Sequence, residues 1–588
     1  MLESRDSQNN HKSHNNSIQE NSLTIKTESL RTDERSRPLS RTILESLLVF
    51  LISYTLLFIG MSLTPNIFDE AIMLTGPMRV LAGQIPHRDF FVNYGPGQFY
   101  TIAGLFRLFG ESILVERLYD LFLKALIVAL VYRIVLLYCR RSIAVWAVSF
   151  MILWFFGLNE MAGNALVPVS LFNLVASILI LPVFLRPVST RRMLVAGGVA
   201  GVATLFRYDT GIALLGTQAT VVAIAIYLRI SVSQNRLRNF ASMFSPYLAG
   251  FAAVTVPALF YYLSRAPFAA FAHDILIYPS RYYHRSRNLP FPGIHLKGLD
   301  KLGVYLPIAV ILILIYLVVA RRLRTSEMDA FSSTPADQNW RGFLITFGLL
   351  AFVMYFKGIV RVSLIHMYLS VLPSLLLIAV LYQHRMTFTR PIRIFVTFVG
   401  WFFVFVAGLS SLREIRFLHI RDTFLPRNIW LSAQGAQPEI RATWCKNENP
   451  LTKGICFFPD NDHIQTIEFI RSHTLPGQRL FVGLTRHDIV FANDNLIYFA
   501  TQRLPATKWS QFDPDLVNRY DIQTQIIHDL ELNAPPYIVL DSEYDSAREP
   551  NESSKSSGVT LLDDYIRNRY QRVETFGELF IWQRMRTP

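Results

Sequence analysis

Ionisable side chains recur beside the ends of long apolar runs in this chain of 588 residues. A carboxylate in such a place can act as a general base on a hydroxyl group, and arginines nearby can bind a phosphate through charge-assisted hydrogen bonds. Charges at a membrane boundary are costly unless they face water or a partner, so the set is a candidate site. Its members are Asp69, Glu70, His87, Arg88, Asp89, Arg117, Glu160, Arg207, Asp209, Arg361 and His366.

Two interpretations of these residues are open on chemistry alone. A base beside phosphate-binding cations at a membrane surface suits a lipid-phosphate substrate. The alternative is that the charges are helix caps and ion pairs at the interface. Asp69 and Glu70 are also compatible with a divalent cation, although adjacent carboxylates point in different directions. The chain has no GxxxxGK phosphate loop and no spaced Cys/His metal cluster, so the sequence requires no cofactor.

A second group of basic and aromatic residues lies in a segment between two later apolar runs, at 265–300. Its members are Tyr278, Arg281, Tyr282, Tyr283, Arg285, Arg287 and Lys297. Binding of an anionic headgroup or a donor, with rings stacked on a sugar, would explain the combination. A solvated basic loop is the alternative.

The composition predicts a membrane protein, because 51% of the residues are hydrophobic and only 17% are charged. A soluble chain is about 25% charged. The first apolar run, Ile43–Met61, is about long enough to cross ~30 Å of hydrocarbon. It starts late and lacks a small-residue cleavage site, which indicates an uncleaved signal anchor. About eleven spans are predicted, at 43–61, 119–139, 142–158, 165–185, 193–206, 210–229, 242–264, 302–320, 341–356, 367–383 and 393–411.

The positive charge predicts the orientation of these spans. The net charge of +14 gathers in arginine clusters at the ends of apolar runs, which is typical of cytoplasmic loops and argues against a nucleic-acid partner. The clusters share one side if the N-terminus is cytoplasmic and Gln98–Gly110 is a short interfacial helix. The outer segments are then 65–117, 159–164, 207–209, 265–300 and 357–366, together with the C-terminal tail.

Three parts are expected along the chain: a disordered cytoplasmic tail at 1–41, a transmembrane domain at 42–411, and an extracytoplasmic α/β domain at 412–588. In the last, 479–484, 537–541 and 577–584 are expected to be strands, and 464–472 and 561–570 have helical spacing. The stretch 549–558 is predicted to be a flexible loop. Cys445 and Cys456 can form a disulfide or remain two free thiols.

An ordered series of short motifs fills the first outer segment. It comprises the acidic pair Asp69-Glu70, the G-x-x-P-x-x-D-F stretch Gly83–Phe90, Tyr94-Gly95-Pro96, Leu108–Ser112 and Arg117. The series resembles the first outer loop of membrane-embedded GT-C glycosyltransferases, of the family 39 and arabinosyltransferase-like group. Weaker matches follow at 205–211, 277–292 and 361–366, and in the last Ser363 replaces the usual acid.

The resemblance implies transfer of a sugar from a polyprenyl-phosphate donor, by a single inverting displacement. It implies Asp69 as the general base and Glu70 as a supporting carboxylate or as the base itself. The other implied roles fall to residues that orient the substrates or bind the donor phosphate. They are Arg88, Asp89, Tyr94, Arg117, Glu160, Arg207, Asp209, Tyr282, Tyr283, Arg361 and His366.

The sequence thus predicts an all-α polytopic membrane domain of GT-C type with a C-terminal soluble α/β domain. The expected partners are a polyprenyl-phosphate-sugar donor, membrane lipids and an acceptor that is a lipid, a glycan or a protein. A bacterial plasma membrane fits the resemblance. A transporter or flippase of lipid-linked or sugar substrates is the main alternative, although charges at one interface and the lack of repeated halves disfavour it. A non-catalytic binding protein is another alternative.

Overall fold

The structure, a computed structural model, covers most of the chain. It describes residues 39–586 except 63, 159–161, 230–234, 294–298, 325–334 and 418–459. Contacts divide the chain into two units, Met1–Ile52 and Ser53–Pro588, and the architecture below belongs to the second. Residues 1–38 of the tail predicted at 1–41, together with Glu160, Cys445 and Cys456, lie outside the described residues. Residues 39–41 belong to the helix Leu39–Ile59, so the prediction of disorder is wrong for them. The domain boundaries at 41 and 412 stay predictions.

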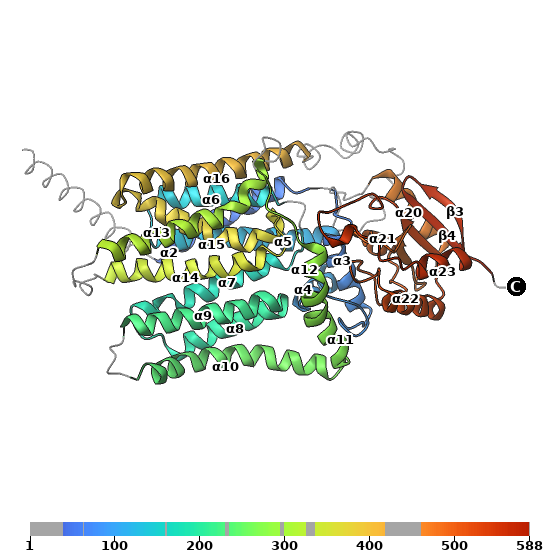
Figure 1. The fold of residues 1–588 in the computed structure, drawn as a ribbon, viewed down its shortest axis with the longest axis horizontal. Helices are drawn as coiled ribbons and strands as arrows, with labels where there is room; N and C mark the ends of the chain where they lie inside the picture. Colours follow the sequence, from blue (N-terminus) through green and yellow to red (C-terminus); the bar gives the residue numbers. More distant parts are fainter. Residues whose placement is uncertain are drawn as a thin grey trace, which may run out of the picture. The chain divides into compact units, whose positions relative to one another are not determined.

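Helices form the larger part of the second unit (Figure 1). The helix α2 (Leu39–Ile59) begins in the first unit and ends in the second. The following helices, in chain order, are α3 (Asp69–Leu81), α4 (Gly97–Phe109), α5 (Ile113–Leu136), α6 (Arg141–Phe156), α7 (Leu166–Ile180), α8 (Thr190–Phe206), α9 (Tyr208–Arg229), α10 (Arg236–Leu263), α13 (Leu306–Arg324), α14 (Pro335–Gly358), α15 (Leu364–Gln383) and α16 (Arg390–Phe417). Short elements connect α10 to α13, namely α11 (Phe268–Ala272), the π-helical η2 (His273–Ile277) and η3 (Pro279–Tyr283), and α12 (His284–Arg287).

The protein is an integral membrane protein, since 8 of the described helices are long and apolar enough to cross a membrane. A helix occupies each of the predicted spans. Three helices at predicted spans do not meet this criterion of length and apolar composition. The helix α5 carries several charges, and α6 and α8 have only 16 and 17 residues. The exact number of crossings and the side of each terminus therefore stay predictions. The predicted interfacial segment forms α4, which buries Phe99 and Phe106 and exposes Leu108.

The helices α8 and α10 pack closely because glycines line their contact. A Cβ atom on Gly197 would lie 1.9 Å from the carbonyl oxygen of Tyr247, and one on Gly250 would lie 1.9 Å from that of Leu194. No side chain fits at either position unless the backbones separate. Small residues at such spacing are the usual means by which helices approach closely in a membrane, where hydrophobic burial does not drive association.

The C-terminal segment forms a four-stranded mixed sheet with helices around it. Its elements are α20 (Asn461–His473), β1 (Phe481–Leu484), α21 (Leu496–Thr501), α22 (Tyr520–Asn533), β2 (Tyr537–Asp541), α23 (Leu561–Arg569), β3 (Tyr570–Phe576) and β4 (Leu579–Arg584). The strand order is β1-β2-β4-β3, with β1 and β2 parallel and the other pairs antiparallel. The predicted strands at 479–484, 537–541 and 577–584 are confirmed. The strand β3 was not predicted, because most of its residues are polar and exposed.

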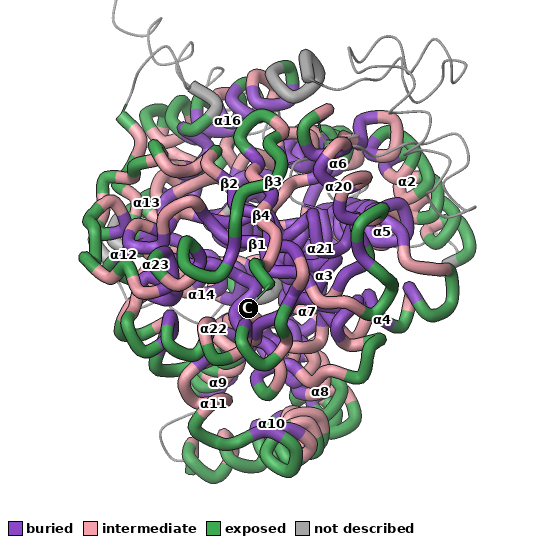
Figure 2. The backbone as a smooth tube through the Cα atoms, turned by 90° about the vertical axis from the view of Figure 1, so that its right-hand side faces the viewer, coloured by how far each residue is buried: buried purple, intermediate pink, exposed green. Residues whose placement is uncertain are grey.

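The core of this sheet includes residues from the loops that join the membrane helices. Every residue of β1 and β2 is buried (Figure 2). Phe91, from the first outer segment, and Tyr278, from between the two π-helical stretches, pack in the same cluster as Trp509 and Phe512. The Tyr278 hydroxyl also donates a hydrogen bond to the carbonyl of Pro514 at 3.1 Å. This shared core holds the outer segments against the C-terminal segment and so fixes the side chains of the site.

Candidate functional site

Asp69 and Glu70 open α3, but their side chains have different surroundings. The Asn66 side chain accepts hydrogen bonds from the backbone N–H groups of Phe68 and Asp69 at 3.0 and 2.7 Å, which caps the helix. Glu70 is fully buried and forms an ion pair with the buried Arg117. Arg117 also donates to the carbonyl oxygen of Ser62 at 2.7 Å. Glu70 and Arg117 therefore hold the start of α3 together, and neither faces the cations described next.

The Asp69 carboxylate is the one member of the acidic pair that faces the candidate site. Within the described part of the chain, no hydrogen bond or ion pair engages its side-chain oxygens. Burial raises the pKa of the Asp69 carboxyl, the nearby Asp513 raises it further, and the charges of Arg287 and Arg361 lower it in part. A partly buried carboxylate with a raised pKa and an unoccupied lone pair has the properties of a general base.

Four cations gather around His366, and two of them, Arg287 and Arg361, also lie near Asp69. Arg207 follows α8, Arg287 ends α12, Lys357 lies in the last turn of α14, and Arg361 precedes α15. Arg207 makes two hydrogen bonds to Asp209, at 3.2 and 3.0 Å, and Lys357 lies 3.9 Å from the same carboxylate. The Arg361 guanidinium donates to the backbone carbonyl of Arg287 at 3.0 Å. The four cations thus come from three segments that are distant in sequence, since Lys357 and Arg361 lie four residues apart.

His366 and two tyrosines complete the cluster. The imidazole of His366 interacts electrostatically with all four cations, and its Nδ1 lies 2.7 Å from the Ser363 hydroxyl. Arg207 stacks on the ring of Tyr94 at 5.3 Å. Burial raises the pKa of Tyr94 and of Tyr283, so both hydroxyls stay protonated and can donate hydrogen bonds. The site therefore combines hydroxyl hydrogen-bond donors with the guanidinium and ammonium groups.

The structure brings together six of the residues predicted from the sequence: Asp69, Tyr94, Arg207, Tyr283, Arg361 and His366, with Asp209 as the partner of Arg207. Arg88 and Asp89 instead form a largely exposed pair with each other, at 2.7 Å. Tyr282 packs under Arg519, at 4.6 Å. Neither arrangement engages the cluster in the described structure, so a substrate-binding role for these three residues stays a prediction.

Sequence reasoning missed three residues of the cluster. Arg287 had been named in the basic segment 265–300, where donor binding was one interpretation, but Lys357 only marked the end of a span. Asp513 and Glu549 come from the C-terminal segment, where no motif indicated a role. Arg287 pairs with Asp513 at 2.6 Å, and Arg361 pairs with Glu549 at 2.6 Å. Contacts between segments more than 180 residues apart leave no local pattern, so only the fold could reveal them.

The arrangement suits an anionic ligand better than a metal ion. Among the described residues, no group of three or more His, Cys, Asp or Glu side chains is placed to hold a metal. Guanidinium groups are planar forks that match a phosphate or a carboxylate through two parallel hydrogen bonds. A divalent cation at Asp69 stays a prediction of the sequence alone.

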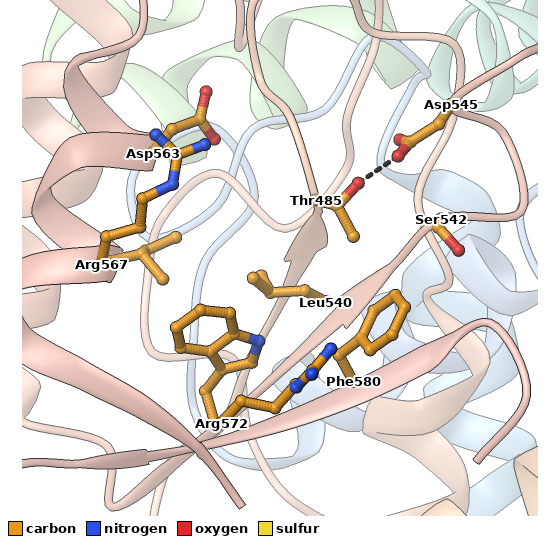
Figure 3. Close-up of a pocket in the computed structure, with 10 residues that line it drawn as sticks. Thr485, Leu540, Ser542, Asp545, Asp563, Arg567, Arg572 and Phe580 are labelled. Carbon is orange, nitrogen blue, oxygen red and sulfur yellow. Dashed lines mark hydrogen bonds between the residues drawn. The ribbon is translucent and has the colours of Figure 1, made fainter. Parts of the chain in front are cut away.

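A separate cavity of about 350 Å³ lies in the C-terminal segment, at the carboxyl ends of β1 and β2 (Figure 3). It is lined by Thr485, Leu540, Ser542, Asp545, Asp563, Ile566, Arg567, Arg572, Phe580 and Trp582. The two carboxylates are already engaged, since Asp545 accepts from Thr485 and Asp563 pairs with His487. None of the predicted site residues lines this cavity, which is therefore distinct from the candidate site.

A scan against protein-family models finds no match, and a search of curated proteins finds none either. Solved structures do show similarity. ArnT from Cupriavidus metallidurans bound to undecaprenyl phosphate is 13% identical over 93% of this chain and 98% of that one, with a TM-score of 0.46. Its apo form is 12% identical over 91% of this chain and 97% of that one. The apo form gives a TM-score of 0.49.

Two further groups of solved structures are similar at the same level. The oligosaccharyltransferase of Archaeoglobus fulgidus is 11% identical over 92% of this chain and 74% of that one, with a TM-score of 0.46. The arabinofuranosyltransferase AftD from Mycobacteria is 14% identical over 94% of this chain and 40% of that one, with a TM-score of 0.45. All of these TM-scores lie below 0.5.

Proposed function

We propose that the chain is a glycosyltransferase that moves a sugar from a polyprenyl-phosphate-linked donor to an acceptor at the extracytoplasmic face of the membrane. One observation carries the proposal: Asp69, whose carboxylate has no hydrogen-bond or ion-pair partner among the described residues, lies near Arg287 and Arg361, two of the four cations around His366. A displacement at an anomeric carbon needs a base for the attacking hydroxyl and cations for the departing phosphate. Asp69 and the neighbouring arginines can supply these two functions. The resemblance of the first outer segment to GT-C enzymes supports the same reaction.

In the proposed mechanism, Asp69 removes the proton from the acceptor hydroxyl as its oxygen attacks the anomeric carbon of the donor. The bond from that carbon to the phosphate oxygen breaks, and the lipid phosphate leaves with the electron pair. Arg287 and Arg361 bind the phosphate and stabilise the charge that develops on it. Arg207 and Lys357 add to the positive potential. The single displacement inverts the anomeric configuration, which product stereochemistry by NMR would contradict if it showed retention.

Glu70 and Arg117 have a structural part in this proposal. Their buried ion pair anchors α3, so that the helix start presents Asp69 to the cations. Tyr94 lies near Asp69, and Tyr283 lies near Arg287 and Arg361; their rings and hydroxyls suit contact with a sugar.

The experiment that tests the proposal incubates the protein, reconstituted in nanodiscs, with radiolabelled polyprenyl-phosphate sugars and crude envelope acceptors. Transfer of label, with release of polyprenyl phosphate detected by mass spectrometry, is the expected result. A transporter or flippase would instead move intact donor across a proteoliposome membrane without breaking the sugar–phosphate bond. Donor bound without turnover in the presence of those acceptors would favour a binding protein.

A further inference from the structure

Two carboxylates of the C-terminal segment occupy the arginines of the candidate site. Arg361 donates from both terminal nitrogens to Glu549, at 2.9 and 2.6 Å. Arg287 donates to Asp513 at 2.6 Å and to the carbonyl of Phe491 at 3.0 Å. The side chains of Arg361 and Glu549 are only 14% and 12% exposed. Each arginine thus already holds an anionic partner in the structure.

The contact between Arg361 and Glu549 has the geometry with which a guanidinium binds a phosphate. Two parallel N–H···O bonds join the planar fork to the two carboxylate oxygens. Phosphate oxygens accept the same pair of bonds. A donor phosphate and the Glu549 carboxylate therefore compete for one position on Arg361.

The charges of the cluster show why the two anions exclude each other. Among the described residues, its cations are Arg207, Arg287, Lys357 and Arg361, and its carboxylates are Asp69, Asp209, Asp513 and Glu549. Positive and negative charges balance. A phosphate added to this balanced set would leave a net negative charge in a partly buried place, which is unfavourable. Departure of one carboxylate restores the balance.

Glu549 is freer to leave than Asp513. Asp513 is 3% exposed and accepts a second hydrogen bond from Gln511 at 2.6 Å, in a stretch beside the buried Phe512. Glu549 lies in the irregular stretch between β2 and α23, where the only regular element among described residues is the short helix η7 (Glu552–Ser554). Among the residues that the structure describes, the Glu549 carboxylate accepts from Arg361 and from Asn551 of the same stretch, the latter at 2.9 Å. The stretch touches the membrane-side loops through Asn551, which donates to the carbonyl of Asn288 at 2.9 Å.

We propose that Glu549 is an exchangeable anionic gate, which occupies the phosphate position on Arg361 in the empty protein and moves away when the lipid phosphate of the donor binds. The inference rests on the proposed function and assigns the C-terminal segment a part in donor admission. Exchange keeps the two arginines neutralised at every stage. It also lets the segment close over the site only when no donor is present or after the phosphate has left.

The test measures binding of farnesyl monophosphate, a water-soluble lipid phosphate, to the full chain in nanodiscs by titration calorimetry. Glu549→Gln removes the charge and keeps the shape, so it should lower the Kd at least fivefold. The matched control is Glu552→Gln, since Glu552 is 53% exposed and pairs only with Lys555; its Kd should equal that of the wild type. In an Arg361→Ala background, binding should weaken and Glu549→Gln should no longer change it.

The outcomes separate the gate from the proposed function. A wild type that binds, an Arg361→Ala variant that binds weakly and a Glu549→Gln variant with the wild-type Kd would overturn the gate and leave the proposed function standing. Absence of binding by every form would overturn both. If Glu549→Gln does not yield folded protein, Glu549→Asp is the test variant instead. Its side chain is one methylene shorter, so the carboxylate lies farther from Arg361. It should lower the Kd by a smaller factor, and an unchanged or raised Kd would overturn the gate.

Discussion

The buried ion pair between Glu70 and Arg117 gives a prediction that separates Glu70 from its neighbour Asp69. Glu70→Gln removes the carboxylate charge that pairs with the Arg117 guanidinium, which is 2% exposed. The carboxylates of Glu116 and Asp120 remain near Arg117. Breaking a buried pair from one side costs about 3–5 kcal/mol. We expect the lower end, about 3 kcal/mol, because the glutamine oxygen still accepts a hydrogen bond and Arg117 keeps the carbonyls of Ser62 and Thr64.

Asp69→Asn should behave in the opposite way. No hydrogen bond or ion pair engages the Asp69 side chain within the described residues, and burial raises the pKa of its carboxyl, so the charge destabilises the folded state slightly. Its neutral replacement should melt at or just above the wild-type temperature. Thermal melting in detergent, followed by intrinsic fluorescence at neutral pH, measures both variants side by side.

Turnover completes the comparison. Below its own melting temperature, Glu70→Gln should retain sugar transfer, whereas Asp69→Asn should lose it. The reasoning is refuted if Glu70→Gln melts with the wild type and yet is inactive, because Glu70 would then act on the substrate and the ion pair would contribute nothing to stability.

Other predictions follow from contacts elsewhere in the chain. Arg361→Lys should lower kcat/KM about 10²-fold in donor titrations, because a lysine cannot form the two-bond fork; wild-type kinetics would contradict this. Gly197→Ala should lower the melting temperature, since its Cβ would meet the Tyr247 carbonyl at 1.9 Å; an unchanged melting curve would show that α8 and α10 separate without cost. Burial raises the pKa of the Asp541 carboxyl to about 7 in the folded protein, from 3.8 in the unfolded chain. The protonated carboxyl therefore contributes fully to folding stability below pH 3.8, and this contribution is lost as the pH rises to about 7. Asp541→Asn should therefore melt above the wild type at pH 8 and no longer do so at pH 4, as a pH series of melting curves would show.

Much of the helical architecture was predictable because hydropathy is a local property. The predicted spans at 165–185 and 367–383 contain no Asp, Glu, Lys or Arg, and the helices α7 and α15 form at these places. The helix α5 was harder, because Asp120 and Lys124 interrupt its apolar face. The structure pairs these two buried side chains one turn apart, at 2.6 Å, which permits their burial.

The candidate site was predictable only in part, for a physical reason. Asp69, Arg207 and Arg361 each lie next to the end of an apolar run, so their place at a membrane boundary follows from the sequence. Their partners do not, because Asp513 and Glu549 reach the site through the tertiary contacts of a mixed sheet and an irregular stretch. The stretch at 549–558 was predicted to be a flexible loop from its Ser, Glu and Lys content, yet its first residue pairs with Arg361 and Asn551 bonds to the carbonyl of Asn288. Local composition cannot anticipate such distant partners.

The most direct measurement is single-turnover transfer of labelled sugar from a polyprenyl-phosphate donor, comparing wild type, Asp69→Asn and the control Asp564→Asn, which changes an exposed carboxylate of α23. The wild type and the control should transfer label at equal rates, with polyprenyl phosphate released in equal amount. Asp69→Asn should bind the donor normally and transfer at least 10³-fold more slowly, as expected for loss of a general base. Equal transfer by wild type and Asp69→Asn, or no cleavage of any donor by the wild type, would contradict glycosyl transfer with Asp69 as the base.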